Sequence, residues 1–272
     1  MRVVEPVLEH TDRSVSLPES GLRRAAILAY GVGSYAIGVA ALVGLILVSL
    51  GVPGFSGGPV HLQSPLAAGL LDLGLLVAFA VQHSVMARPS FKRRWTRIIH
   101  PSMERSTFVL ATGLVLLPIL ALWQPIPARL WSFEAAPARE VVLGVGLLGW
   151  AYLFAATFAI DHFELFGLQQ VWRAFRGRAP RPVPFRERWM YHFDRHPIMT
   201  GVLVGLWATP VMTVGHLLLC AGLSAYVVIG VHFEERTLRR MWGDRYADYA
   251  RRVPTVVPTF GGRGDRERGG AR

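Results

Sequence analysis

The stretch RHPIMTG, at residues 195–201, separates a strongly charged segment from an apolar run of membrane-spanning length that continues to HFEERTL at residues 232–238. A cation, an imidazole and a proline suited to the first turn of a helix precede the apolar run. Two adjacent carboxylates, Glu234 and Glu235, follow it. If the chain reverses direction at residues 210–215, both charged ends return to the same side of the bilayer. We therefore expect the chemistry of this protein where these two ends meet.

The composition is that of a membrane protein rather than of a soluble domain. Of the 272 residues, 52% are hydrophobic and only 17% are charged. The net charge of +11 is compatible with nucleic-acid binding, but the basic residues stand between apolar segments, where they set membrane orientation. We therefore expect no nucleic-acid partner. The single cysteine, Cys220, provides neither a disulfide framework nor a thiolate metal site.

Six apolar segments are candidates for membrane-spanning helices. A helix needs about 20 apolar residues to cross the hydrocarbon core, and the last two segments, of about 18 residues each, are near the lower limit. The sequence therefore predicts an all-α polytopic transmembrane helical bundle of five to six spans, in which the last two form a short helical hairpin. The six segments are residues 25–52, 66–84, 107–123, 140–160, 197–214 and 216–233.

Connections rich in basic residues alternate with poor ones along the chain. Residues 85–106 and 161–195 are rich in arginine, whereas residues 53–65 contain neither Lys nor Arg. By the positive-inside rule, both rich connections and both termini face the cytoplasm, which predicts an integral protein of the cytoplasmic (inner) membrane, surrounded by membrane lipid. Residues 1–262 then form a single membrane domain, and residues 263–272 are a basic tail that is disordered by composition.

Polar residues gather at the cytoplasmic ends of the predicted spans. Any one of these clusters alone is more simply explained by snorkelling or interfacial anchoring. Five clusters on one membrane face are harder to explain in that way, and together they predict a cytoplasmic chamber. The clusters are QHS at 82–84, ERST at 104–107, DHFE at 161–164, Tyr191 with RHP at 195–197, and HFEE at 232–235.

The residues around Pro197 are suited to binding an anion. Proline fits the first turn of a helix, so Arg195, His196 and the free N–H groups of that turn face one vestibule, which favours a carboxylate or a phosphate. Glu234 and Glu235 are adjacent and therefore point in different directions. One of them can pair with an arginine while the other binds an amine or hydroxyl group of a ligand. Pairing of both with neighbouring arginines is the alternative.

Histidines on the same face could belong to a metal or haem site. His83, His162, His196 and His232 all fall there, but a histidine at the end of a span is more often a hydrogen-bonded structural group. Apart from one pair interrupted by a proline, the spacing does not match that of a helical metal site, and we expect no metal. Asp72, inside the second span, is more consistent with a tie between helices than with a proton path.

Longer motifs resemble a known group of membrane enzymes. Tyr191, the RHP motif, Gly201, HFEERTL at 232–238 and GDRYADYARRVPTVVP at 243–258 resemble the C-terminal signature of the isoprenylcysteine carboxyl methyltransferase superfamily. Four further motifs are similar to its methanethiol S-methyltransferase branch. They are QHSVMARPSFKRRWTR at 82–97, ERSTFVL at 104–110, HFELFGLQQVW at 162–172 and WATPVMTVGHLL at 207–218.

The resemblance implies an enzyme that uses S-adenosyl-L-methionine to methylate methanethiol, a small volatile thiol, to dimethyl sulfide, with hydrogen sulfide as a further acceptor to be tested. It also implies a cofactor held between the cytoplasmic ends of the last two spans and the basic tail. An arginine and helix N–H groups suit the methionyl carboxylate, and a glutamate suits the amine or the ribose hydroxyls. The implied cofactor residues are Tyr191, Arg195, His196, Pro197, Gly201, Glu234, Glu235, Tyr246 and Tyr249.

A thiol acceptor also needs a proton acceptor, because alkyl thiols are mostly protonated at neutral pH. We expect His83 or His162 to take the proton, with Asp161 or Glu164 orienting the imidazole. These four residues are the predicted catalytic group.

Three other functions remain open on the sequence alone. The first is a methyltransferase of the same superfamily that acts on an isoprenylcysteine carboxylate or another lipophilic acceptor. The second is an NADPH-dependent membrane reductase, and the third is a structural or haem-associated membrane protein. Detection of dimethyl sulfide, comparison of S-adenosylmethionine with NADPH binding, and an absorbance spectrum distinguish them.

Overall fold

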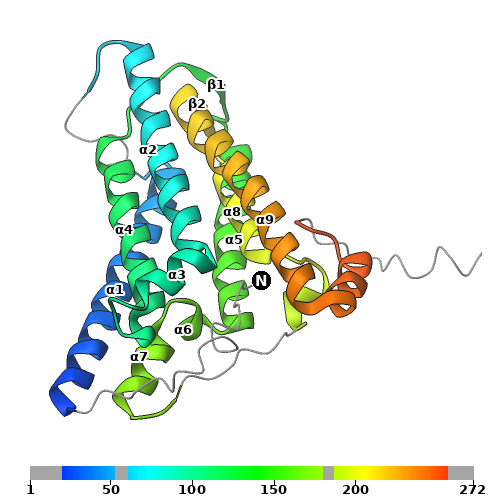
Figure 1. The fold of residues 1–272 in the computed structure, drawn as a ribbon. Helices are drawn as coiled ribbons and strands as arrows, with labels where there is room; N and C mark the ends of the chain where they lie inside the picture. The colour runs from blue at the N-terminus through cyan, green and yellow to red at the C-terminus, as the bar shows by residue number, and fades with distance from the viewer. Residues whose placement is uncertain (1–19, 53–60, 180–186, 257–272) are drawn as a thin grey trace, which may run out of the picture.

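The computed structural model describes residues 20–52, 61–179 and 187–256, and it consists almost entirely of helices (Figure 1). Within these residues, five helices are long and apolar enough to cross a membrane. The predicted all-α polytopic membrane bundle is therefore confirmed. The five helices are α1 (Gly21–Ser49), α2 (Pro65–Ala87), α4 (Glu104–Leu122, preceded by the short helix η1 at Pro101–Met103), α5 (Ala136–Ile160) and α9 (Val214–Arg252).

Polar caps begin three of these helices. The side chain of Ser20 accepts a hydrogen bond from the backbone of Arg23 at the start of α1. Ser64 does the same at the start of α2, where Pro65 occupies the first turn, and Thr213 accepts from the backbone N–H of His216 at the start of α9. Each cap satisfies a backbone donor that has no partner within its helix.

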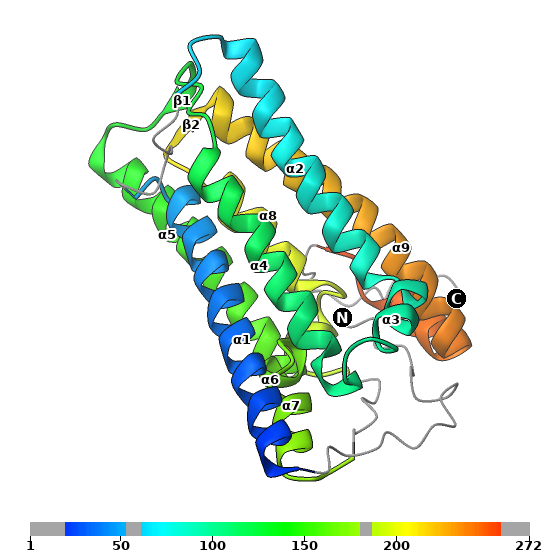
Figure 2. The same cartoon turned by 60° about the vertical axis from the view of Figure 1, so that its left-hand side comes forward.

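The two ends of the bundle carry different elements. At one end, β1 (Arg129–Ser132) pairs antiparallel with β2 (Val211–Thr213). The short helices α6 (His162–Leu165) and α7 (Leu168–Phe175) lie at the other end, and α3 (Pro89–Trp95) follows α2 there (Figure 2). Between the two ends, α1 packs along α4, α5 packs along α8, and α2 contacts both α4 and α9. The predicted clusters at 82–84, 104–107 and 161–164 stand where α2 ends, α4 begins and α5 passes into α6, at the end with α6 and α7, whereas the cluster at 232–235 lies within α9 (Figure 2).

The last apolar hairpin differs from the sequence prediction. Instead of two segments of similar length, the chain forms α8 (Pro197–Trp207), with 11 residues, and α9, with 39 residues. An 11-residue helix is about 16 Å long, roughly half of the hydrocarbon thickness, so α8 alone cannot cross. Pro210 lacks an N–H group and favours an extended residue before it, which ends the helical path. The chain continues as β2, which is held by β1, before α9 begins.

The far end of α9 bends back on the bundle. Gly243 has φ 50° and ψ −130°, a conformation that interrupts the helix and that favours glycine. The turns after Gly243 return toward the short helix η2 (Trp189–His192), where the hydroxyl of Tyr249 donates to the backbone oxygen of Tyr191 at 2.6 Å. The C-terminal segment is thereby brought against the start of α8.

Glycines allow α5 and α8 to approach closely. A Cβ atom on Gly201 would lie 2.6 Å from the backbone nitrogen of Leu153 and 2.7 Å from the carbonyl oxygen of Gly149. Backbone atoms of a packed helix cannot move aside as the end of a flexible side chain can. In this structure Gly201, one of the implied cofactor residues, serves the contact between these two helices.

We expect Gly201→Ala to destabilise the protein by about 3 kcal/mol, because the added methyl group forces α5 and α8 apart. The measurement is thermal unfolding of the purified protein in detergent. Gly33→Ala is a matched control on α1, since a Cβ there meets no atom within 4 Å. A Gly201 variant as stable as the Gly33 variant would contradict the expected clash.

Candidate functional site

Arg195 is the centre of a buried clasp that ties the start of α8 to the C-terminal segment. Its Nε and Nη2 atoms each lie 2.7 Å from Oε1 of Glu235. Nη1 donates to the backbone oxygens of Ala250, at 2.7 Å, and Val253, at 2.5 Å, and Nη2 donates to Oγ1 of Thr255 at 2.7 Å. All five N–H donors of the guanidinium are thereby used. In this arrangement no donor of Arg195 remains for the cofactor carboxylate expected from the sequence.

His196 lies between the two adjacent carboxylates. Its Nε2 is 3.3 Å from Oε1 of Glu235, and its Nδ1 is 3.6 Å from Oε2 of Glu234, which is too long for a hydrogen bond. Glu235 also pairs with Arg239, whose Nη2 lies 3.3 Å from Oε2. Glu235 thus belongs to the Arg195 clasp, and Glu234 lies on the other side of the His196 ring.

Asp194 is fully buried beside the first turn of α8, which begins with Pro197. Its Oδ1 accepts a hydrogen bond from the backbone N–H of His196 at 2.9 Å, and its Oδ2 accepts one from the hydroxyl of Thr200. Burial outweighs these contacts and raises the pKa of Asp194 from 3.8 to about 6. The start of α8 is therefore fixed by a carboxyl group that is more readily protonated in the folded protein.

We expect Asp194 to make the protein less stable as the pH rises from about 4 to about 6. In this window the folded state binds more protons at Asp194 than the unfolded chain does, so the free energy of unfolding falls by about 3 kcal/mol. Asp194→Asn keeps an acceptor for His196 but removes the titration. Thermal unfolding of both proteins across this window measures the effect, and identical pH slopes would be the contrary result.

Three buried tyrosines pack beside the clasp, one from η2 and two from the C-terminal part of α9. Tyr191, Tyr246 and Tyr249 are each at most 1% exposed, and the ring centroids of the last two are 5.9 Å apart. Burial, and then the charge of Glu234, raises the pKa of Tyr191 above its ordinary value. Its hydroxyl therefore keeps its proton and can donate a hydrogen bond to a ligand.

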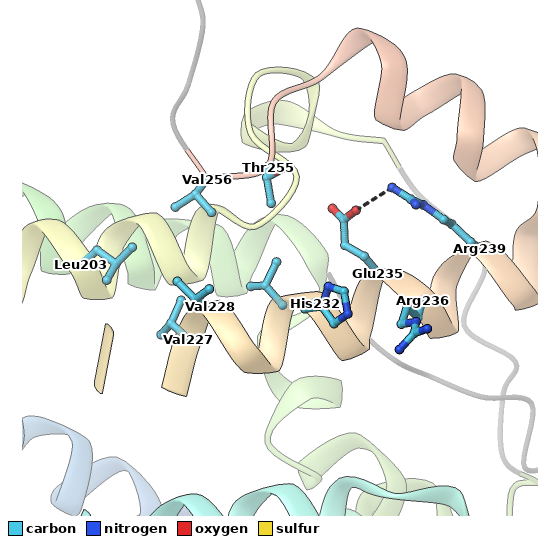
Figure 3. Close-up of a pocket in the computed structure, with 10 residues that line it drawn as sticks. Leu203, Val227, Val228, His232, Glu235, Arg236, Arg239, Thr255 and Val256 are labelled. Carbon is cyan, nitrogen blue, oxygen red and sulfur yellow. Dashed lines mark hydrogen bonds and ion pairs between the residues drawn. The ribbon is translucent and has the colours of Figure 1, made fainter. Parts of the chain in front are cut away.

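A groove of about 320 Å³ runs between α8 and α9 on one side of the clasp (Figure 3). Thr255 and Val256 of the C-terminal segment form one wall, and Leu203 and Val228 line its apolar part. Figure 3 shows Glu235 reaching toward Arg239, whereas the side chains of His232 and Arg236 leave α9 on another side. We refer to this space as the outer groove.

A second group of polar side chains is linked by charge to Glu234 or to Arg105, and we call it the inner polar cluster. The charge of Glu234 acts on Arg105, Tyr191 and Tyr226. The charge of Glu164 also acts on Arg105, and Arg105 in turn acts on His83. These side chains come from α2, α4, α6, η2 and α9, so segments distant in the sequence come close enough for their charges to interact. The members are His83, Arg105, Glu164, Tyr191, Tyr226 and Glu234.

Several polar atoms of the cluster and its neighbours are buried without a hydrogen-bond partner. Within the described residues they include Oη of Tyr191, Nδ1 of His196, and Oε1 of both Gln82 and Gln170. Leaving one such atom unpaired costs about 1–3 kcal/mol. A polar ligand that pairs with them recovers this free energy, and donors and acceptors are both represented. The cluster therefore has the character of a binding site for a polar molecule.

His83 faces this cluster within an aromatic surrounding. Its ring centroid is 4.6 Å from that of Phe108, 5.3 Å from that of Phe79 and 5.9 Å from that of Tyr226. Its Nδ1 lies 3.2 Å from Oγ1 of Thr112. In the part of the chain that the structure describes, no hydrogen-bond partner is found for its Nε2. One ring nitrogen of His83 is therefore available to a ligand.

His162 has a different environment, although it was an equal candidate in the sequence. Its Nδ1 is 2.8 Å from Oγ1 of Thr157 and its Nε2 is 2.9 Å from the hydroxyl of Tyr35. Because Thr157 donates its own proton to the backbone of Phe154, Nδ1 of His162 is the donor and Nε2 is the acceptor. Burial lowers the pKa of His162 below its ordinary value. The ring is thus a neutral tie with both nitrogens engaged.

The two acids expected to orient an imidazole make other contacts. Oδ1 of Asp161 accepts from the backbone N–H of Glu164 at 3.0 Å and caps α6. Oε1 of Glu164 accepts from Nε2 of Gln170 at 2.8 Å. Asp161 therefore supports the local backbone, whereas Glu164 places charge in the inner polar cluster. No group of three or more His, Cys, Asp or Glu in residues 20–52, 61–179 and 187–256 could hold a metal ion.

Sequence reasoning did not single out Arg105, Tyr226 or Gln170. Arg105 was present in the ERST cluster, but nothing in its spacing distinguished it from the other arginines of the basic connections. Tyr226 stands in an apolar run that resembles ordinary core, and Gln170 stands on a short amphipathic helix. Only the meeting of α2, α4, α6, α7 and α9 reveals the three as neighbours of one site.

Several curated bacterial proteins similar to this chain are named methanethiol S-methyltransferase. Methanethiol S-methyltransferase of Mycobacterium tuberculosis is 41% identical over 243 residues, which cover 87% of this chain and 98% of that protein. Methanethiol S-methyltransferase 2 of Bradyrhizobium diazoefficiens is 44% identical over 240 residues, which cover 86% and 91%. Nurim of Homo sapiens is more distant, with 32% identity over 78% of this chain and 86% of that protein.

No family model and no solved structure matches this chain. The assignment therefore depends on the two bacterial relatives, whose similarity extends over nearly their whole length and over most of this chain. Identity above 40% across most of both chains is sufficient to assign a family. On this basis the chain is a member of the methanethiol S-methyltransferase family.

Proposed function

We propose that this protein transfers the methyl group of S-adenosyl-L-methionine to methanethiol and releases dimethyl sulfide. The observation that carries the proposal is that two buried unpaired polar atoms, Oη of Tyr191 and Nδ1 of His196, lie near the charge of Glu234 in a chain of this family. Hydrogen sulfide, the smaller thiol, is a second acceptor to test in the same assay.

The proposed donor site is the inner polar cluster together with the clasp. S-adenosylmethionine supplies a methyl group already activated by attachment to a positively charged sulfur. Glu234 provides negative charge beside that sulfur or the donor amine, and the hydroxyl of Tyr191 and Nδ1 of His196 are placed to hydrogen-bond the polar edges of the molecule. Arg195 and Glu235 frame this site, since their own hydrogen bonds are made to the chain.

The remaining implied cofactor residues support the site from outside it. Pro197 begins α8, Gly201 permits its contact with α5, and Tyr246 and Tyr249 pack the C-terminal segment over the clasp. Their proposed role is to fix the backbone that presents Tyr191, His196 and Glu234. Closing the site in this way also keeps water from competing with the acceptor.

His83 is the proposed proton acceptor for the thiol. Its free Nε2 and its aromatic walls provide a small site for the thiol, and the charge of the neighbouring Arg105, which opposes a proton on the imidazole, would be offset by the thiolate anion. A proton that leaves the thiol sulfur passes to Nε2, which converts the acceptor into the more nucleophilic thiolate. His162 is the less suitable candidate because both of its nitrogens are engaged.

The proposed orientation places both termini, α6 and α7 on the cytoplasmic side of the inner membrane, because the arginine-rich connections stand at that end. The donor then enters from the cytoplasm, whereas a small apolar thiol can arrive through the lipid. We propose a single domain over residues 1–262. The tail at 263–272 lies outside the described residues.

The test is direct assay of the purified protein in nanodiscs. We expect dimethyl sulfide in the headspace when methanethiol and S-adenosylmethionine are both supplied, and calorimetric binding of S-adenosylmethionine but not of NADPH. Glu234→Gln should weaken donor binding by about 10- to 100-fold, because one charged contact is lost. Methylation of an isoprenylcysteine carboxylate without any dimethyl sulfide would overturn the acceptor assignment.

A further inference from the structure

Arg105 extends into the inner polar cluster from the first turn of α4. Its Nε donates to the backbone oxygen of Leu165 at 2.7 Å, and its guanidinium lies 5.1 Å from the centroid of the Phe108 ring. In the described part of the chain, neither of its terminal nitrogens has a hydrogen-bond partner and no carboxylate lies within ion-pair distance of it. Arg105 is therefore held through Nε, and its two terminal nitrogens are available to a ligand.

The acids near Arg105 are engaged elsewhere. Oε1 of Glu104 lies 3.8 Å from Nζ of Lys92, Glu164 holds Gln170, and Glu234 lies beside His196. These carboxylates act on Arg105 through their charge without neutralising it by a direct contact. A guanidinium held in a fixed position, with its fork unfilled, is suited to an anion supplied from outside the chain.

The surroundings limit the size and polarity of that anion. Phe108 lies under the guanidinium and also against His83, whose ring is flanked by Phe79 and Tyr226. The position next to Arg105 is thus bounded by the ring of Phe108, which also packs against the imidazole of His83. A small, soft anion with an apolar substituent fits this combination better than a strongly hydrated one.

We propose that Arg105 binds the acceptor as its thiolate, so that the sulfur anion lies between the guanidinium fork and the His83 ring. This inference rests on the proposed function and names the acceptor subsite of the same site. The thiol proton passes to Nε2 of His83 as the acceptor binds. A lone pair of the thiolate sulfur then forms the new carbon–sulfur bond to the methyl group, while the bond from that carbon to the donor sulfur breaks and its electron pair remains on the donor sulfur.

The guanidinium of Arg105 could instead bind the carboxylate of the methyl donor. Two binding measurements distinguish a thiolate ligand from a donor carboxylate. Methanethiol is titrated calorimetrically into protein loaded with S-adenosylhomocysteine, in two buffers of different ionisation enthalpy, which counts the protons released. If methanethiol binds as the thiolate, its proton passes to His83 or to the buffer. The number of protons released per bound methanethiol should therefore rise with pH in the wild type. S-adenosylmethionine is titrated separately into the same variants.

For Arg105→Met we expect kcat/KM for methanethiol to fall by about 10- to 100-fold at neutral pH, with donor affinity within about threefold of wild type. The loss should shrink as the pH rises, because free thiolate becomes abundant near the thiol's own pKa, about 8.5 for a cysteine thiol. Charged groups facing Arg105 are Glu104, Glu164, Glu234 and His83, and all are unchanged in the variant. Arg105→Lys, which keeps the charge without the fork, should recover part of the activity.

Arg173→Met is the matched control, since Arg173 also donates from Nε to a backbone oxygen, that of Ala179 at 2.8 Å, but on an exposed surface. We expect it to behave as wild type. Weakened donor binding with an unchanged pH profile in Arg105→Met would assign the fork to the donor carboxylate and overturn the proposal. Wild type that binds S-adenosylmethionine yet makes no dimethyl sulfide would instead refute the proposed function.

Discussion

Replacing Arg195 by alanine is expected to lower the free energy of unfolding by about 3–5 kcal/mol and to abolish binding of the methyl donor. The variant leaves Glu235 buried without its main partner and removes the hydrogen bonds to Ala250, Val253 and Thr255. The C-terminal segment then loses its attachment to the start of α8. Thermal unfolding and calorimetry with S-adenosylmethionine measure the two effects.

The matched control for this variant is Arg239→Ala. Arg239 also pairs with Glu235, at 3.3 Å, but its side chain is 59% exposed, so its loss should cost less than about 1 kcal/mol. Combining Arg195→Ala with Glu235→Gln should recover part of the stability, since no buried charge is left unpaired. If the double variant is instead as unstable as the sum of the single variants, the ion pair is not the source of the effect.

Replacing His83 by alanine is expected to lower kcat by about 10²- to 10⁴-fold while leaving donor affinity unchanged, because the imidazole is proposed to take the thiol proton and not to touch the donor. Raising the pH should partly restore turnover by supplying thiolate directly. Single-turnover kinetics with methanethiol measure the chemical step. His61→Ala, at an exposed position, provides the comparison. Equal losses of turnover and donor affinity would indicate a structural role for His83.

Much of the fold followed from local pattern. Uninterrupted apolar segments of sufficient length predicted the spans, and serine and threonine caps begin α1, α2 and α9 at nearly the expected residues. The lengths of the two helices in the last hairpin were mispredicted, because the hydrophobicity of a segment does not show which hydrogen bonds its backbone makes. Residues 211–213 are apolar enough to extend a helix, yet they pair with residues 129–132, which are distant in sequence.

For the candidate site too, the sequence determined one part and the tertiary structure another. Residue types alone determined that a membrane bundle would place arginine, histidine and paired glutamates at one end, because charge is expelled from the hydrocarbon core. Only tertiary packing decided which of these side chains keep a polar atom available to a ligand. The N–H groups of Arg195 donate to other groups of the chain. Both ring nitrogens of His162 contact Tyr35 and Thr157, whereas His83 keeps a free nitrogen. Which partners a polar group meets depends on the approach of separate helices, and the order of residues along any one helix does not contain that information.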